Sequence, residues 1–322
     1  MQALGFDSHE AVHVKALIYG KPGTGKTTMG VSAPKPLILL SERQGMTHVR
    51  QAAAMIGRQP VGVLFMDGIE DYRCVLRTLA LATQQPALRD GPFVVKDAHG
   101  SILFESETWP ETVVIDSLTD VCRLIDAQIL LESPPKLGKD NLPVNSERYW
   151  SVLRDRCEKF IRSFRDIDFH VLYLCLEDDK TIGEGDEAER KVGPALPMRA
   201  LPDTVAAAVN VVGVMARRIR QRANPDGTRS EEAAIDYLVR TVGPQWYLLK
   251  PYRPLLDLEQ PDFSSWVARI VASANGEAVP SAPVASLAPT VEPKAAPAVS
   301  TPQARTRRPR SQVAPTDTSK GS

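Results

Sequence analysis

Several features that define particular protein classes are scarce or absent in this sequence. Its four cysteines lie far apart and form no C-x-x-C pair, which argues against a zinc site or a disulfide framework. Lys and Arg together number 39, as do Asp and Glu, so the net charge indicates no nucleic-acid partner and any basic surface has to be local. No apolar stretch reaches the length of a membrane span, and the segment MQALGFDSHEAVHV has no signal-peptide pattern. We therefore expect a cytoplasmic protein with no membrane partner.

The composition divides the chain in two. With 322 residues and 43% hydrophobic residues there is ample material for a core. Residues 276–322 are instead rich in Pro, Ala, Ser and Thr, and such a segment cannot bury enough apolar surface to offset its ordering entropy. We expect one folded domain over residues 1–275 and a disordered tail over 276–322. The tail carries a basic cluster, RTRRPR, at 305–310, which is either a solvated linker end or a contact for nucleic acid or a partner protein.

Apolar runs of strand length alternate with helical patterns through the folded part. The runs are nearly continuous in apolar residues, as in central parallel strands covered on both faces, and they lie at 14–20, 36–42, 61–66, 111–117 and 169–177. A helix is expected at 145–165, where apolar residues recur at helical spacing. This alternation predicts an α/β fold with a mostly parallel central sheet flanked by helices.

The pattern changes towards the C-terminus of the folded part. The segments 210–222 and 234–243 flank the turn sequence NPDGTRS and predict an antiparallel hairpin, which 245–250 is expected to extend. A smaller hairpin is expected around KDAHGS at 96–101. There is no internal repeat.

One motif carries specific chemistry. The segment GKPGTGKT at 20–27 matches G-x-x-x-x-G-K-[ST] in full, after an apolar strand and before a helical pattern, which is the setting of a phosphate-binding P-loop. Glycines let the backbone N–H groups point at phosphate oxygens, and the start of the next helix adds free donors. Lys26 would contact the β- and γ-phosphates, Thr27 would ligate Mg²⁺ and Thr28 would contact the α-phosphate of ATP. The residues expected to line the phosphate site are Gly20, Lys21, Pro22, Gly23, Thr24, Gly25, Lys26, Thr27 and Thr28.

Two acidic residues are candidates to complete this site. Asp116 ends the apolar strand TVVID, where the Walker B aspartate holds Mg²⁺; the alternative is a cap on the helix that begins near Leu118. Ser117 stands where many ATPases have a glutamate, so the water-activating carboxylate has to come from elsewhere. Glu42, just past the second strand, is the best candidate for the general base, and an ordinary surface glutamate is the alternative.

These segments resemble RecA, in which the strand after the P-loop helix ends in the catalytic glutamate and the Walker B strand reads as apolar residues followed by Asp-Ser. The chain also resembles the phage AAA-type ATPases grouped with RecA-like single-strand annealing proteins, the Sak group. That resemblance covers about residues 14–260 and includes VVIDSLT, a later VLYL strand and KVGPALP at 191–197. It implies a RecA-like fold, slow or DNA-stimulated hydrolysis of ATP with Mg²⁺, a homo-oligomer, and the cytoplasm of a bacterial host if a phage encodes the chain.

The resemblance also implies where DNA and a neighbouring subunit would act. RecA-like proteins often carry a Gln or His γ-phosphate sensor after the fourth strand, where this chain has Glu177 and Asp178; we expect a mobile loop at 178–196. Lys250 and Arg253 are candidates for a cation that completes a neighbour's site. Candidate contacts to single-stranded DNA are Lys191, Arg218, Arg220 and Arg222, the last three alternating along one face of a strand. A solvated hairpin is the equal alternative for that row.

Three functions are consistent with these patterns. The leading one is ATP-dependent DNA recombination or single-strand annealing, with a single-strand-binding or replication partner reached through the tail. The second is a nucleotide-binding regulator or assembly ATPase that does not bind DNA, and the third is a P-loop kinase. The chain contains no N-K-x-D and no L-S-G-G-Q, which disfavours GTPases and ABC ATPases.

Overall fold

A computed structural model describes residues 11–132, 147–182, 188–198, 200–223 and 229–281, without the side chains of 147–148 and 219–235. The chain divides into two units, Met1–Ala285 and Ser286–Ser322, and the second falls wholly outside the described residues. The predicted basic cluster at 305–310 therefore lies outside the described residues, and the domain boundary and disordered tail stay predictions.

The first unit alternates strands and helices from its start. The strands are β1 (Lys15–Gly20), β2 (Pro36–Leu40), β3 (Gly62–Phe65), β4 (Phe93–Lys96), β5 (Ile102–Ser106), β6 (Thr112–Asp116), β7 (His170–Ile182), β8 (Glu189–Pro194), β9 (Val211–Ala223), β10 (Arg229–Arg240) and β11 (Leu258–Glu259). The α-helices are α1 (Lys26–Val31), α2 (Gly45–Ile56), α3 (Ile69–Gln84), α4 (Leu118–Glu132), α5 (Glu147–Arg165), α6 (Leu201–Ala208) and α7 (Phe263–Ala274), and a short 3-10 helix spans Pro86–Asp90.

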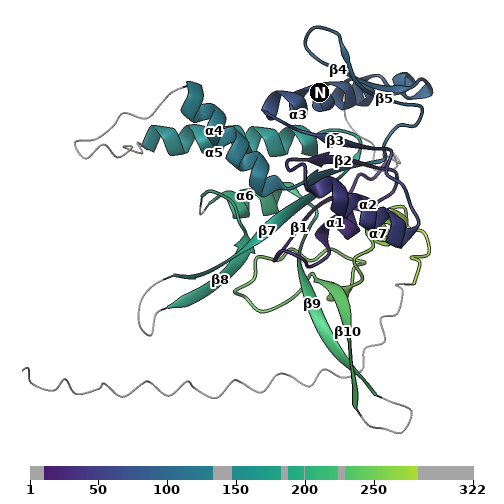
Figure 1. Cartoon of the computed structure of the whole chain (residues 1–322), viewed down its shortest axis with the longest axis vertical. Coiled ribbons are helices and arrows are strands. Elements are labelled where there is room, and N and C mark those ends of the chain that lie inside the picture. The colour runs from purple at the N-terminus through teal and green to yellow at the C-terminus, as the bar shows by residue number, and fades with distance from the viewer. Residues whose placement is uncertain (1–10, 133–146, 183–187, 199, 224–228, 282–322) are drawn as a thin grey trace, which may run out of the picture. The chain divides into compact units, whose positions relative to one another are not determined.

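The central sheet has the order β11-β10-β9-β1-β7-β6-β2-β3, with β8 paired to β7 (Figure 1). The pairs from β9 through β3 are parallel, whereas β9–β10, β10–β11 and β7–β8 are antiparallel. The fold class predicted from the sequence is therefore confirmed. Because β7 lies between β1 and β6, the chain segments that follow Gly20 and Asp116 emerge at the same edge of the sheet.

Alternate residues of the central strands enter two separate cores. On one face Leu17, Leu39 and Tyr173 pack with side chains of α3, α4, α5 and α6. On the other face Ile18 and Leu174 pack with side chains of α1, α2 and α7, so both faces of the sheet are covered (Figure 1). This explains the continuous apolar runs in the sequence, since neither face of these strands meets water.

Both predicted hairpins form. β9 and β10 pair antiparallel around residues 224–228, which lie outside the described residues, and β4 pairs with β5 in a separate two-stranded sheet. The segment 245–250 extends the hairpin only at its end, where Lys250 makes an isolated antiparallel bridge to Val212 of β9, whereas Tyr247 bridges to Val192 of β8. β10 pairs instead with β11.

The expected mobile loop at 178–196 is also corrected. β7 continues to Ile182 and pairs with β8, so most of this acidic segment is a third antiparallel hairpin. Cross-strand ion pairing explains why charged residues form strands here: the Arg190 guanidinium donates to both carboxylate oxygens of Asp179, at 2.9 and 2.6 Å. Residues 183–187 lie outside the described residues.

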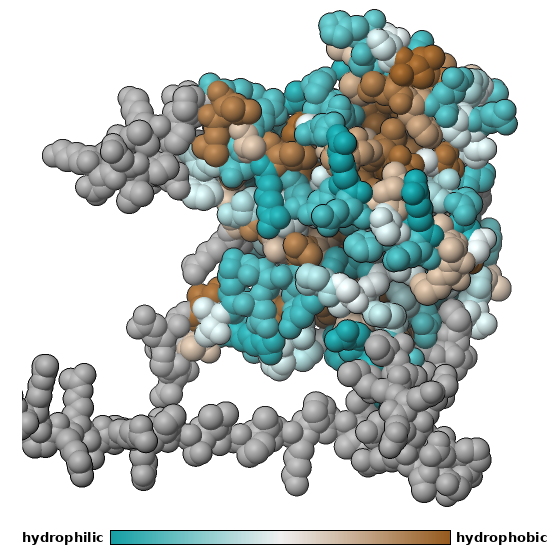
Figure 2. All heavy atoms as spheres, viewed as in Figure 1, coloured by the Kyte–Doolittle hydropathy of each residue, from teal (hydrophilic) through white to brown (hydrophobic). Residues whose placement is uncertain are grey.

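Exposed apolar side chains occur at several places on the surface, and Figure 2 shows brown spheres both near the β4–β5 hairpin and near α4 and α5. Leu81 on α3 and Ile102 and Leu103 on β5 are 45%, 57% and 49% exposed, and Leu131 on α4 is 85% exposed. In the described part of the chain, no helix is both long and apolar enough to cross a membrane.

One buried histidine at the start of β7 makes stability depend on pH. His170 accepts a hydrogen bond from the Val14 N–H at Nδ1 (2.9 Å), and burial lowers its pKa to about 4. The unfolded chain binds a proton near pH 6.5, so the stabilisation is complete above that pH and is lost as pH falls towards 4. We expect the free energy of unfolding to fall by about 2 kcal/mol between pH 7.5 and pH 5 from this residue. His170→Asn, which keeps an acceptor but does not titrate, should remove that part of the slope in urea unfolding; an unchanged slope would contradict the assignment.

Candidate functional site

The loop between β1 and α1 has the conformation that its glycines require. Gly23 and Gly25 have φ of 74° and 91°, in the left-handed region that other residues rarely adopt. A Cβ on Gly20 would lie 2.7 Å from the Met215 backbone oxygen, so only glycine fits there. Because α1 has only six residues, the phosphate donors here are the loop and first-turn N–H groups rather than a long helix dipole.

Lys26 lies inside this loop. Its ammonium group is buried and donates to the backbone oxygens of Gly20 (2.7 Å) and Lys21 (2.9 Å). Burial lowers the pKa of Lys26, while the charge of Asp116 opposes that shift. The amine is therefore held at the centre of the loop, where phosphate oxygens can replace the two carbonyls as its partners.

Thr27 and Asp116 meet although they are 89 residues apart. The Thr27 hydroxyl donates to Asp116 Oδ2 at 2.9 Å. Burial raises the pKa of Asp116, and the Thr27 hydrogen bond and the Lys26 charge act in the opposite direction. A hydroxyl and a carboxylate side by side, next to a phosphate cradle, suit Mg²⁺, which prefers oxygen ligands and keeps several waters. No group of three or more His, Cys, Asp or Glu suited to a metal occurs in the described residues, so Mg²⁺ would depend on this pair and the phosphates.

Glu42 follows β2, the neighbour of β6 in the sheet. The Ser41 N–H donates to the Asp116 backbone oxygen (3.0 Å), and the exposed Glu42 carboxylate is close enough to raise the pKa of Asp116. The Ser41 hydroxyl also hydrogen-bonds the hydroxyl of the buried Tyr72 (2.9 Å), which fixes the turn that carries Glu42. This role of Tyr72 could not be predicted from the sequence, because nothing in the local pattern of α3 separates it from a core residue.

Two further carboxylates near the loop were not assigned roles from the sequence. Asp120, in the first turn of α4, accepts a hydrogen bond from the Ser117 hydroxyl and also raises the pKa of Asp116. Glu177 lies 3.8 Å from the Lys21 ammonium, in the segment where the resemblance to RecA-like proteins implies a γ-phosphate sensor. Its side chain is only 10% exposed, so a nearly buried acid borders the phosphate site.

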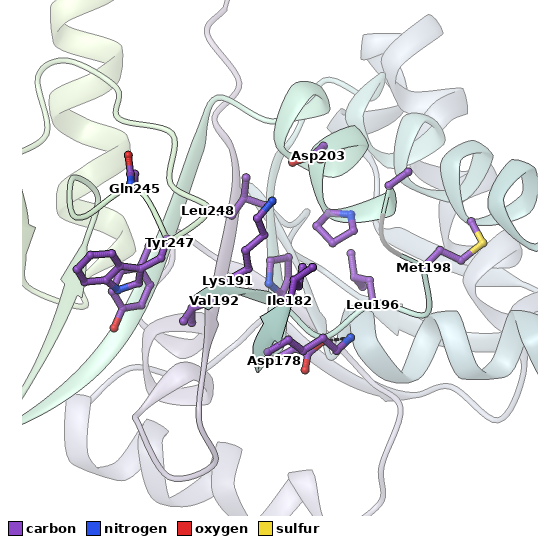
Figure 3. Close-up of a pocket in the computed structure, with 16 residues that line it drawn as sticks. Asp178, Ile182, Lys191, Val192, Leu196, Met198, Asp203, Gln245, Tyr247 and Leu248 are labelled. Atoms are coloured by element: carbon purple, nitrogen blue, oxygen red, sulfur yellow. Dashed lines mark ion pairs between the residues drawn. The ribbon is translucent and has the colours of Figure 1, made fainter. Parts of the chain in front are cut away.

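The cations predicted to contact DNA lie on two different hairpins. Lys191 on β8 lines a cavity of about 600 Å³ between the β7–β8 hairpin, α6 and residues 245–248 (Figure 3). Its ammonium group is 3.4 Å from Glu189. Arg218 on β9 is half-buried and stands opposite Asp236 in the β9–β10 register. Arg220 and Arg222 also fall in β9, but their side chains lie outside the described residues.

Lys250 and Arg253, the two candidates for a cation that completes a neighbouring subunit's site, differ in their surroundings. The Lys250 ammonium donates to the backbone oxygens of Ala206 (3.0 Å) and Val209 (2.5 Å), at the C-terminal end of α6. This internal role argues against its reaching another subunit. Arg253 is exposed and makes no hydrogen bond or ion pair with the described residues, so it stays the candidate.

Of the comparisons with known proteins, the match to a family model is the informative one. No curated protein matches the chain. A solved structure of a prototypical ATPase from the type III secretion system of pathogenic bacteria is 13% identical, with a TM-score of 0.32, over 63% of this chain and 51% of that one. The match thus spans about half of that ATPase, and a likeness of this extent carries no argument. The model of an AAA domain family matches residues 13–231, more than half of the chain and all of the P-loop and Asp116 region. The chain therefore belongs to this AAA domain family and is a P-loop ATPase of the AAA type.

Proposed function

We propose that this protein hydrolyses ATP with Mg²⁺ at the loop of residues 20–28. The observation that carries the proposal is the Thr27 hydroxyl, 2.9 Å from Asp116 Oδ2, beside the buried ammonium group of Lys26. When bound, Mg²⁺ supplies charge neutralisation for the phosphate oxygens. Thr27 and Asp116 would hold the metal, Lys26 would hold the β- and γ-phosphates, and Glu42 would accept a proton from the attacking water.

We further propose that the ATPase acts on single-stranded DNA in phage-type recombination or annealing, within the bacterial cytoplasm. Support comes from the resemblance to RecA-like annealing ATPases and from arginines at 218, 220 and 222 along β9. The resemblance to RecA-like ATPases also supports a homo-oligomer, in which the exposed Arg253 would complete a neighbour's site. The tail would recruit a single-strand-binding or replication protein.

A specific observation favours an assembly ATPase that does not bind DNA. The cations of the β7–β8 hairpin all have acidic neighbours: Lys180 pairs with Asp178, Arg190 with Asp179 and Lys191 with Glu189. Such pairing lowers the positive potential that would attract a phosphate backbone.

ATP hydrolysis measured with and without single-stranded DNA separates the two functions. The DNA proposal predicts a several-fold stimulation that weakens as salt rises, because cation–phosphate contacts release counterions. Hydrolysis that DNA leaves unchanged at low salt, together with no gel shift, would favour the assembly ATPase. Transfer of phosphate to a nucleoside or sugar would favour a kinase.

A further inference from the structure

The phosphate site has a definite direction. Thr27, Asp116 and Glu42 lie towards β6 and β2, so the terminal phosphate of a bound nucleotide points to that side. The nucleoside then leaves the loop on the opposite side, towards β9, which pairs with β1 up to Tyr19 and Val214. Whatever recognises the base has to come from this part of the chain.

One aromatic side chain lies there. A Cβ built on Gly25 would be 3.4 Å from Tyr237 Cδ1 and 3.5 Å from Cγ, so the ring of Tyr237 packs against the backbone of the phosphate loop. Tyr237 is still 37% exposed, so part of the ring faces solvent. It comes from β10, more than two hundred residues after the loop, which is why no local motif marks it.

The hairpin register adds a cation on the same face. Arg217 stands opposite Tyr237, and Met215 stands opposite Val239 two positions away. Opposite residues of an antiparallel pair share a face, so all four lie on the face that meets the loop, and opposite Cβ atoms are about 4.5–5.5 Å apart. Arg217 is exposed and has no ion pair with the described residues. Arg218, the predicted DNA contact, lies on the other face.

We propose that Tyr237 is the platform on which the nucleobase stacks, with the Arg217 guanidinium beside it. This rests on the proposed function, because the phosphates have to occupy the loop. Every base offers a π-face to an aromatic ring, so stacking supplies affinity with little discrimination between bases. The site therefore takes nucleoside triphosphates as a class, and the phosphate loop and the base platform contribute separately to affinity.

The test compares a ligand that has a base with one that has none. Calorimetric titrations of the full chain would use Mg-ATP and Mg-tripolyphosphate. Tyr237→Ala should weaken Mg-ATP binding roughly 5- to 150-fold and leave tripolyphosphate binding unchanged. Tyr237→Phe, which keeps the ring, should bind both ligands as the wild type does. Trp246→Ala is the matched control, since Trp246 is 40% exposed and lines the separate 600 Å³ cavity.

The outcomes distinguish failure of the base platform from failure of the proposed ATP site. An equal loss of both ligands in Tyr237→Ala would mean that the ring only supports the loop, and no loss of either would mean that it does not contact the nucleotide. Each result overturns the base platform and leaves the ATP site standing. A wild-type protein that binds neither ligand would overturn the ATP site itself.

Discussion

Lys26→Met is expected to lower the affinity for Mg-ATP by a factor of roughly 30 or more. The ammonium group of Lys26 is buried among loop carbonyls, and among the described residues no other lysine side chain donates to these carbonyls. Removing one partner of a buried, hydrogen-bonded charge pair costs about 2–5 kcal/mol. Methionine keeps the length and apolar stem of the side chain, so the loss would come from the charge and its hydrogen bonds. Equilibrium binding of a fluorescent ATP analogue measures the effect.

Two measurements guard this result against a folding defect. The Lys26 side chain also hydrogen-bonds the backbone oxygens of Gly20 and Lys21 and so stabilises the loop. Thermal unfolding of Lys26→Met should therefore be recorded beside that of the wild type. Lys159→Ala is the matched control, because Lys159 is an exposed lysine on α5 whose side chain, among the described residues, pairs only with Asp155. Undiminished ATP affinity in a folded Lys26→Met protein would defeat the assignment of the phosphate loop.

The sequence predicted the fold well for strands whose side chains are buried on both faces of the sheet. β1, β2 and β6 carry nearly continuous apolar runs because helices cover both faces, and short runs of this kind are typical of central parallel strands. The loop at 20–28 was predictable for another reason: a phosphate cradle needs particular residue types at fixed spacing, so the motif and the geometry are the same constraint. The β9–β10 hairpin was predicted from the sequence Pro-Asp-Gly between its two strands.

Features that depend on pairing between distant segments could not be predicted. The acidic run after Leu176 is typical of a loop in sequence. In the structure this run pairs with β8 to form a hairpin, in which Arg190 of β8 makes an ion pair with Asp179. Lys250 reads as a surface cation, and only the fold shows that it binds carbonyls at the end of α6. The contacts of Tyr72 with Ser41 and of Tyr237 with Gly25 also join residues far apart in the chain. Local patterns carry no record of such contacts.

Three carboxylates compete for the role of general base, and their environments differ. Glu42 is exposed at the end of β2, whereas Glu177 is nearly buried next to Lys21 and Asp120 already accepts from the Ser117 hydroxyl. A general base has to reach the attacking water on the far side of the terminal phosphate from Lys26. Glu42 comes from β2, beyond Asp116 in the sheet, and its side chain is free of other partners among the described residues.

Glu42→Gln is therefore expected to slow ATP hydrolysis by about 10²- to 10⁴-fold, the usual contribution of a general base, and to leave Mg-ATP affinity within a few-fold of the wild type. Glutamine keeps the shape and removes only the proton acceptor. Single-turnover hydrolysis, with the protein in excess over ATP and well above the Kd, measures the chemical step, and the same titration as for Lys26→Met measures binding. Glu177→Gln is the parallel variant: because Glu177 faces Lys21, its loss should alter nucleotide affinity more than the rate of the chemical step. The reverse pattern, with a slow Glu177→Gln and an active Glu42→Gln, would move the base to β7, the strand between the phosphate loop and Asp116.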